Sequence, residues 1–156
     1  MNDNFTELMK RPDIEQAVTA YAEMTAKIRD QLATDVGRTW EQRSDGGGTA
    51  CGNEVPGVDA DGGKRNLPRW MLPGNLTDEQ WTHAETLVGE IAAGYGFHPK
   101  PEVVVDRPSE HDVVFRKPDG AWMGFGTAVN TTLTVATGCH LTAEAHQRGK
   151  PKSGRG

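Results

Sequence analysis

The chain has 156 residues, a net charge of −5 at pH 7 and only 35% hydrophobic residues, and 19 of its residues are glycine. This length suits a single domain whose core can fold without a metal. Because a nucleic-acid-binding surface needs clustered lysine and arginine, the acidic balance argues against a nucleic-acid partner. No apolar run reaches the ~20 residues of a membrane-spanning helix, and the polar start MNDNFTELMKRP is not a signal peptide.

The first predicted element is an amphipathic helix over residues 12–36. Its apolar residues recur at helical spacing along one face, from Ile14 to Leu32. Pro12 suits the first helical position, and Gly37 supplies a stop. This helix should cover the core with its apolar face.

The segment after this helix is predicted to be mostly loop. A short strand is expected at TWEQRS, residues 39–44, and a glycine-rich loop that holds Cys51 occupies residues 44–75. Within this loop LPRWML is extended, because Pro68 fits neither a helix nor a central strand.

A second helix is predicted over residues 78–95. Thr77 and Gln80 have the spacing of a capping box, in which each side chain bonds the backbone N–H of the other. Leu76 precedes this cap and can pack on Trp81. The start of the helix is therefore well defined.

The last third of the chain is predicted to be a series of antiparallel strands. The turn KPDG has the chemistry of a three-residue hairpin loop, which sets Phe115 opposite Met123 and Val113 opposite Phe125. In this register the large apolar residues share one face. The predicted strands are EVVVD, DVVFRK, AWMGFGTAV and TLTVATGC.

These elements predict an α+β fold, a two-layer sandwich of two amphipathic helices on an antiparallel sheet of about four to five strands. We expect a single domain over residues 8–141. Residues 1–7 and the basic tail over residues 142–156 are expected to be flexible.

The two cysteines, Cys51 and Cys139, leave three alternatives open. Cys139 shares strand parity with Leu133 and Val135, so it faces the core, and a disulfide to the glycine-rich loop is favoured. Two buried inert thiols are the second alternative. The third is a reactive or metal-binding cysteine beside His140, but the chain lacks the CxxC or HxxxH spacing of a metal site. We therefore expect neither a metal nor an organic cofactor.

The most enzyme-like feature is the run DRPSEHD. It brings together Asp106, Glu110, His111 and Asp112, and a histidine with a nearby carboxylate could act as a general base. A polar hairpin turn between two strands explains the same residues and is the favoured interpretation. No catalytic residue is assigned.

A candidate ligand-binding face follows from the strand register. Trp122 and Arg116 should point away from the helices, and parity adds Thr132 and Thr134, with Val114, Gly124 and Gly126 between them. An aromatic ring with hydroxyl and guanidinium neighbours suits sugars or glycolipid head groups. The alternative, which we favour at this point, is that the 44–75 loop folds over this face with Trp40 and Trp70 and buries it.

Several motifs together resemble the LppA-type lipoproteins of mycobacteria and their relatives. They are KRPDIEQA, ACG, WMLPGNLTDEQW, YGF, EVVVDRP, FGTAVNT and TGCHL, in an order that covers roughly residues 8–141. The resemblance matches Cys51 and Cys139 to the family's cysteines. It implies an exported, lipid-anchored protein of the cell envelope, whose signal peptide and lipid-bearing cysteine are expected to be absent from this chain.

The resemblance implies a location but no reaction. We expect a non-catalytic envelope domain that binds an envelope glycolipid, a carbohydrate or a protein partner. It would meet the membrane only through the lipid anchor. The alternative is an envelope hydrolase that uses His111 with a nearby carboxylate.

Overall fold

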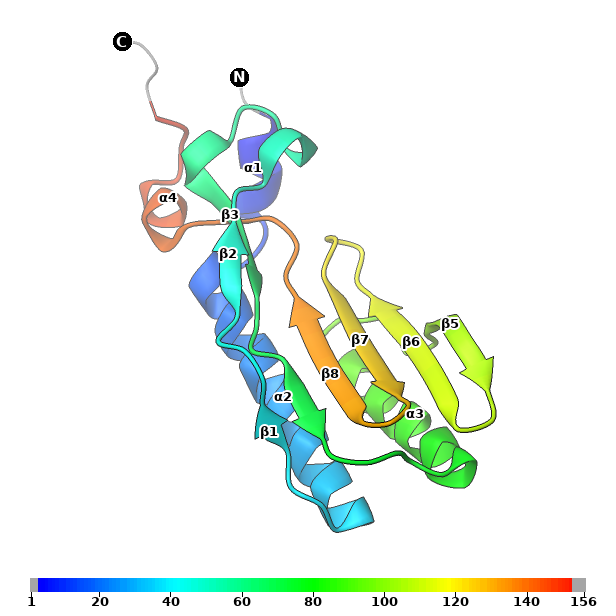
Figure 1. Ribbon diagram of the computed structural model, residues 1–156. Helices are drawn as coiled ribbons and strands as arrows, with labels where there is room; N and C mark the ends of the chain where they lie inside the picture. The colour runs from blue at the N-terminus through cyan, green and yellow to red at the C-terminus, as the bar shows by residue number, and fades with distance from the viewer. Residues whose placement is uncertain (1–2, 153–156) are drawn as a thin grey trace.

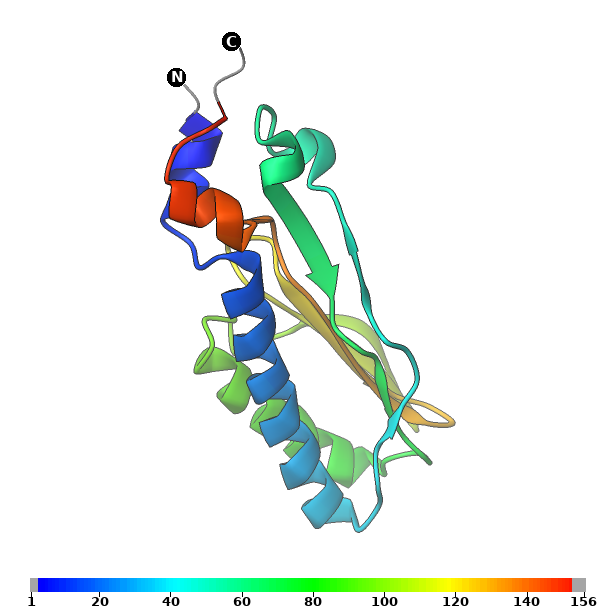
Figure 2. The same cartoon turned by 90° about the vertical axis from the view of Figure 1, so that its left-hand side faces the viewer.

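The computed structural model describes residues 3–152 and has an α+β fold. Nine strands form one antiparallel sheet, and two long helices lie along one side of its central strands (Figure 1 and Figure 2). The helices are α1 (Asp3–Met9), α2 (Ile14–Val36), α3 (Asp78–Ala93) and α4 (Ala143–Arg148). The strands are β1 (Glu41–Gln42), β2 (Gly47–Thr49), β3 (Gly62–Asn66), β4 (Trp70–Leu72), β5 (Glu102–Arg107), β6 (Glu110–Arg116), β7 (Trp122–Thr127), β8 (Thr131–Ala136) and β9 (His140–Leu141).

The sheet has nine strands rather than the predicted four to five, because the glycine-rich stretch is not a loop. The main path runs β1-β4-β8-β7-β6-β5, while β3 pairs with β2, β8 and β9. Strands β2 and β3, with the sequences GGT and GGKRN, carry almost no apolar residues and show no alternation. They extend the sheet because their neighbours supply backbone hydrogen-bond partners, which a pattern of side chains does not reveal.

The predicted hairpin register is confirmed. Phe115 pairs with Met123 and Val113 with Phe125, and all four side chains are buried. Their shared face packs against α2 and α3 in the main hydrophobic core. The apolar side of the sheet therefore faces the helices, and its other side is free of them (Figure 2).

Helix α2 begins at Ile14, two residues later than predicted. Asp13 is its N-cap and forms a reciprocal capping box with Gln16, which leaves Pro12 outside the helix. Gly37 ends it in the left-handed conformation, with φ of 69°. The side chains buried along one face are those of Ile14, Ala17, Tyr21, Met24, Thr25, Ile28 and Leu32.

Helix α3 begins as predicted and ends earlier. Thr77 and Gln80 form the capping box, and Leu76 and Trp81 lie in the same buried cluster. The helix ends at Ala93, two residues before the predicted end. The chain turns away there so that Phe97 can reach the core, where it stacks edge-on against Tyr21.

A second, smaller core extends the packed part of the chain beyond the predicted limits at residues 8 and 141. Phe5 and Leu8 of α1 and Ala145 of α4 are buried against Cys51, Cys139, Val58 and Leu141. Helices α1 and α4 thus lie within the two ends that were expected to be flexible, and both pack at one end of the sheet (Figure 1). Residues 1–2 and 153–156 of those predicted ends lie outside the described residues. The sequence did not predict these two helices, because each is short and mostly polar. Only the few apolar residues that face the disulfide indicate that the helices are packed.

Strand β5 forms an outer edge of the sheet and is irregular. Its pairing with β6 shifts register between Val103 and Val105, which is a β-bulge. Val103 and Val104 are 59% and 55% exposed.

Candidate functional site

The two cysteines form a disulfide that joins the segment before η1 (Gly52–Glu54) to the connection between β8 and β9. Their Cα atoms are 5.7 Å apart across 88 residues of sequence. Gly62 lies so close that a Cβ there would come within 3.3 Å of both sulfurs. The predicted disulfide is therefore confirmed. It leaves neither sulfur free to act as a nucleophile or a metal ligand.

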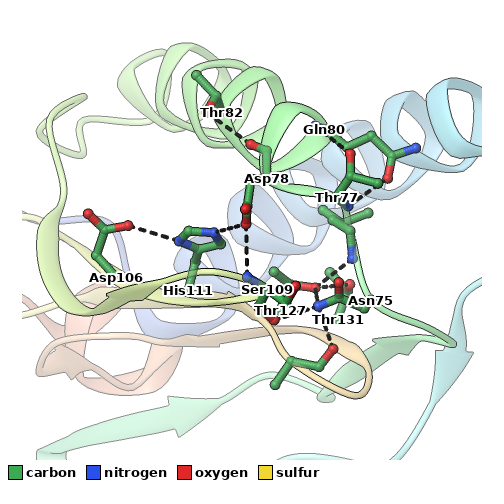
Figure 3. A network of polar contacts seen from close by, with 12 residues as sticks. Asn75, Thr77, Asp78, Gln80, Thr82, Asp106, Ser109, His111, Thr127 and Thr131 are labelled. Atoms are coloured by element: carbon green, nitrogen blue, oxygen red, sulfur yellow. Dashed lines mark hydrogen bonds and ion pairs between the residues drawn. The ribbon is translucent and has the colours of Figure 1, made fainter.

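His111 connects the β5–β6 hairpin to the start of α3 (Figure 3). Its Nε2 lies 2.8 Å from Asp78 Oδ1, and its Nδ1 lies 3.0 Å from Asp106 Oδ1. Asp78 also accepts a hydrogen bond of 2.9 Å from the backbone N–H of Ser109. Both carboxylates can accept from the ring only when each ring nitrogen carries a proton.

The charges around this imidazole affect its neighbours. The hydrogen bond from His111, followed by the backbone N–H of Ser109, lowers the pKa of Asp78. Burial, followed by the charge of Asp106, raises the pKa of Glu85. The ring of His111 is only 8% exposed, and both of its nitrogens already have partners. A general base needs a free nitrogen within reach of substrate, so this geometry suits a structural role.

A second polar network lies beside the first and fastens the loop before α3. The side-chain amide of Asn75 donates to the carbonyls of Ser109 and Ala128, at 2.8 and 2.6 Å (Figure 3). The Thr127 hydroxyl accepts from the backbone N–H of Leu76 at 2.9 Å and meets Thr131 Oγ1 at 2.9 Å. These bonds hold the helix start against the sheet.

The candidate ligand face is the side of the sheet that lacks helices. Cross-strand pairs place Arg116 beside Trp122, and Gly124 beside Thr134. Trp122 is half-buried, and its ring passes over Gly124, where a Cβ would lie 3.5 Å from Trp122 Cζ3. Arg116 is exposed, and its guanidinium contacts Glu102 at 3.1 Å.

The predicted cover over this face is absent, because Trp40 and Trp70, which were expected to form it, lie on the helix side. Trp40 is buried in the main core and donates its indole N–H to the carbonyl of Arg29, at 3.0 Å. Trp70 pairs with the inward-facing Leu133 and stacks on the Arg29 guanidinium, 3.7 Å from the ring centroid. The favoured expectation that these residues bury Trp122 is therefore wrong. Residues 44–75 continue the sheet sideways instead.

The structure adds Asp112 to this face, although from the sequence it was weighed only with the polar run DRPSEHD and not with the ligand face. Asp112 pairs with Gly126, which in turn pairs with the exposed Thr132. A Cβ on Gly126 would lie 3.0 Å from Asp112 Oδ1, so the glycine makes room for the carboxylate. Partial burial raises the pKa of Asp112. The strand parity that selected Thr132 would also have selected Asp112.

The chain can be compared with known proteins on this basis. The model of the LppA family, described as a lipoprotein confined to pathogenic Mycobacterium, matches residues 1–143. The chain belongs to the LppA family. The resemblance inferred from its motifs is thus confirmed, and membership places the protein among membrane-associated envelope lipoproteins. No curated protein matches the chain.

Two solved structures share the fold of this LppA-family chain. The lipoprotein LppA of Mycobacterium tuberculosis superposes with a TM-score of 0.75 at 16% identity, covering 91% of this chain and 86% of that one. A DUF4853 family protein from Actinomyces odontolyticus gives a TM-score of 0.62 at 12% identity, covering 85% and 71%.

Two absences complete the description of this LppA-family domain. Within residues 3–152, no cluster of three or more histidine, cysteine or acidic side chains could hold a metal ion. In the same part of the chain, no helix is both long and apolar enough to cross a membrane.

Proposed function

We propose that this chain is a non-catalytic envelope domain, located on the exported side of the cytoplasmic membrane, that binds carbohydrate on the open face of its sheet. The disulfide supports the exported location, because such bonds persist in oxidising compartments. The LppA family supports the envelope, where glycolipid head groups supply the ligand chemistry.

The observation that carries the binding proposal is the partly exposed ring of Trp122 on a face that no helix covers. A sugar ring stacks on a flat aromatic surface through its apolar C–H groups, and the neighbouring glycines on β7 remove side chains that would stand in the way. Trp122 keeps part of its surface exposed on this face, and exposed apolar surface often marks a binding site.

Polar groups on the same face can receive the hydroxyls of a sugar. Thr132 and Thr134 can donate and accept, Arg116 only donates, and the Asp112 carboxylate only accepts. They lie on both sides of the glycines, since Arg116 pairs with Trp122 and Asp112 with Gly126. The face thus offers an aromatic platform with hydrogen-bonding groups at two ends, as a neutral or weakly anionic glycan requires.

Binding is tested by sedimentation of the protein with vesicles that contain envelope glycolipids, and by titration with soluble oligosaccharides derived from them. We expect Trp122→Ala to lose at least tenfold in affinity and Asp112→Asn to lose less, with both variants folded. Trp70→Ala serves as the matched control, since that ring lies on the helix side. Equal binding by wild type and Trp122→Ala would refute the proposal.

His111 does not support the alternative of a hydrolase. Hydrolysis would need the imidazole to take a proton from water or from a nucleophile, and both ring nitrogens already face carboxylates. The geometry therefore favours binding over catalysis.

A further inference from the structure

The linker between α1 and α2 is held by two histidines from the far end of the chain. His140 Nδ1 lies 2.9 Å from the carbonyl oxygen of Pro12. His146 Nε2 lies 3.0 Å from the Arg11 carbonyl and 3.2 Å from that of Met9. Carbonyls only accept, so each of these ring nitrogens carries the proton.

The same linker is fastened next to the disulfide. The guanidinium of Arg11 donates to the carbonyl oxygen of Cys139, at 2.7 Å. Helix α1, which precedes the linker, packs Phe5 and Leu8 against the disulfide. The hydrogen bonds that hold the linker therefore also help to keep α1 packed against the disulfide.

His140 is sealed inside this junction with one nitrogen unsatisfied. The residue is 1% exposed, and Nε2 has no hydrogen-bond partner. The closest carboxylate oxygen, Asp119 Oδ2 in the β6–β7 turn, lies 3.7 Å away. Nδ1 donates to the Pro12 carbonyl, and no acceptor lies within hydrogen-bond distance of Nε2. This geometry fits the neutral imidazole, in which Nε2 carries a lone pair and no proton.

The charged and titratable groups around this ring come from each packed segment. Arg11 from the linker and Lys117 from the end of β6 are positive, and Asp119 from the turn is negative. Tyr21 of α2 accepts a hydrogen bond of 2.9 Å from Lys117 Nζ. Burial has the largest effect and lowers the pKa of His140. The Pro12 carbonyl and Asp119 raise this pKa, and the two cations lower it further.

We propose that this junction is an acid-sensitive latch, in which protonation of His140 at Nε2 releases the linker and α1 from the end of the sheet. The disulfide keeps Cys51 and Cys139 joined in the released state, so only the N-terminal part opens. The proposal rests on the unsatisfied Nε2 nitrogen and on the nearly complete burial of the ring. It is independent of carbohydrate binding, which lies on the other face of the sheet.

The direction of the pH effect follows from linkage. The docked state binds the proton less well than the released state, so docking is fully stable above the unfolded histidine pKa of about 6.5 and weakens as the pH falls below it. Between pH 7.5 and 5.5 the opening equilibrium should rise by up to about tenfold.

Hydrogen exchange measured by mass spectrometry tests the latch in the intact chain. After correction for the intrinsic rate, protection of residues 3–12 should fall by up to about tenfold between pH 7.5 and 5.5, while that of β7 stays constant. His140→Asn can still donate to the Pro12 carbonyl but takes up no proton, so it should remove the pH dependence. His83→Asn, at an exposed histidine of α3, should leave it unchanged.

Protection of residues 3–12 that does not depend on pH, or that depends on it equally in His140→Asn, would overturn the latch. If His140→Asn does not fold, nitrogen chemical shifts of the wild-type imidazole decide the matter. Protonation of His140 and loss of protection must then share one midpoint. Separate midpoints would also overturn the proposal.

Discussion

The imidazole of His111 lies flat on the indole of Trp81, with ring centroids 5.2 Å apart and planes 9° from parallel. Trp81 stacks in turn on Phe125, at 4.9 Å. Trp81 therefore contacts both rings: Phe125 lies in the main core, and His111 meets the carboxylates of Asp78 and Asp106. The histidine thus joins the apolar core to a polar helix start.

This arrangement predicts how stability depends on pH in the acid range. The pKa of Asp78 is lowered in the folded state, so its contribution is present above the unfolded value of about 3.9 and is lost as the pH falls through the folded value. Asp78→Asn should flatten the decline of the urea midpoint between about pH 5 and 2.5. Glu79→Gln, in the same helical turn, should retain it. An unchanged acid slope in Asp78→Asn would argue against this assignment.

The tryptophans of the two faces should differ in their contribution to stability. Trp81 is 4% exposed and packs in the main core, so Trp81→Ala should lower the free energy of unfolding by about 3–5 kcal/mol. Trp122 is half-buried on the open face, so Trp122→Ala should cost about 1–2 kcal/mol, because it sheds less buried area. Chemical denaturation measures both. A core-sized loss in Trp122→Ala would mean that the face is structural.

The disulfide should be a major source of stability. Because Cys51 and Cys139 are 88 residues apart, the chain-entropy model gives about 4–5 kcal/mol for the closed loop. The double variant Cys51→Ala with Cys139→Ala should lose a stabilisation of this order in denaturant unfolding. Alkylation of unreduced protein, produced under oxidising conditions, should add no mass. Two added alkyl groups would show free thiols.

Two glycines at the end of α3 should respond in opposite ways to the same substitution. A Cβ on Gly89 would lie 2.5 Å from the Pro99 carbonyl oxygen, so Gly89→Ala should destabilise by about 1–3 kcal/mol as overpacking does. Gly94 is exposed and has φ of −65°, so Gly94→Ala should be neutral or slightly stabilising. Thermal melts of the two variants make the comparison. If the two variants had equal stability, the close contact between Gly89 and the Pro99 carbonyl would be contradicted.

Folding should not require a metal. The described part of the chain brings together no ligand set, and its core is apolar. The unfolding midpoint should therefore be the same with and without a strong chelator. A marked drop after chelation would contradict this prediction.

The parts of the fold that were predicted correctly are those whose pattern lies within one element. The capping box of Thr77 and Gln80 and the register of the KPDG hairpin depend on neighbours a few residues apart, so local chemistry determines them. The outward direction of Trp122 followed from the same parity argument.

The parts that were missed depend on distant partners. Strand β3 pairs with β8 and β9, 70 or more residues away, and its glycines carry no side-chain signal. Phe5 and Leu8 pack in a cluster with Cys51 and Cys139, which are distant from them in the sequence. The three tryptophans at 40, 70 and 122 could be placed on one face or two only once the strand order was known, which explains the mistaken cover over Trp122.

The bulge in β5 has a consequence for the protein at high concentration. A regular edge with exposed Val103 and Val104 would offer a straight row of backbone groups to a second molecule, and sheets would then grow from chain to chain. The register shift between Val103 and Val105 bends this row, so that an incoming strand cannot align along its whole length. The irregular edge thus acts against polymerisation, and a chain shortened by Val104 would regain a straight edge and tend to form fibres.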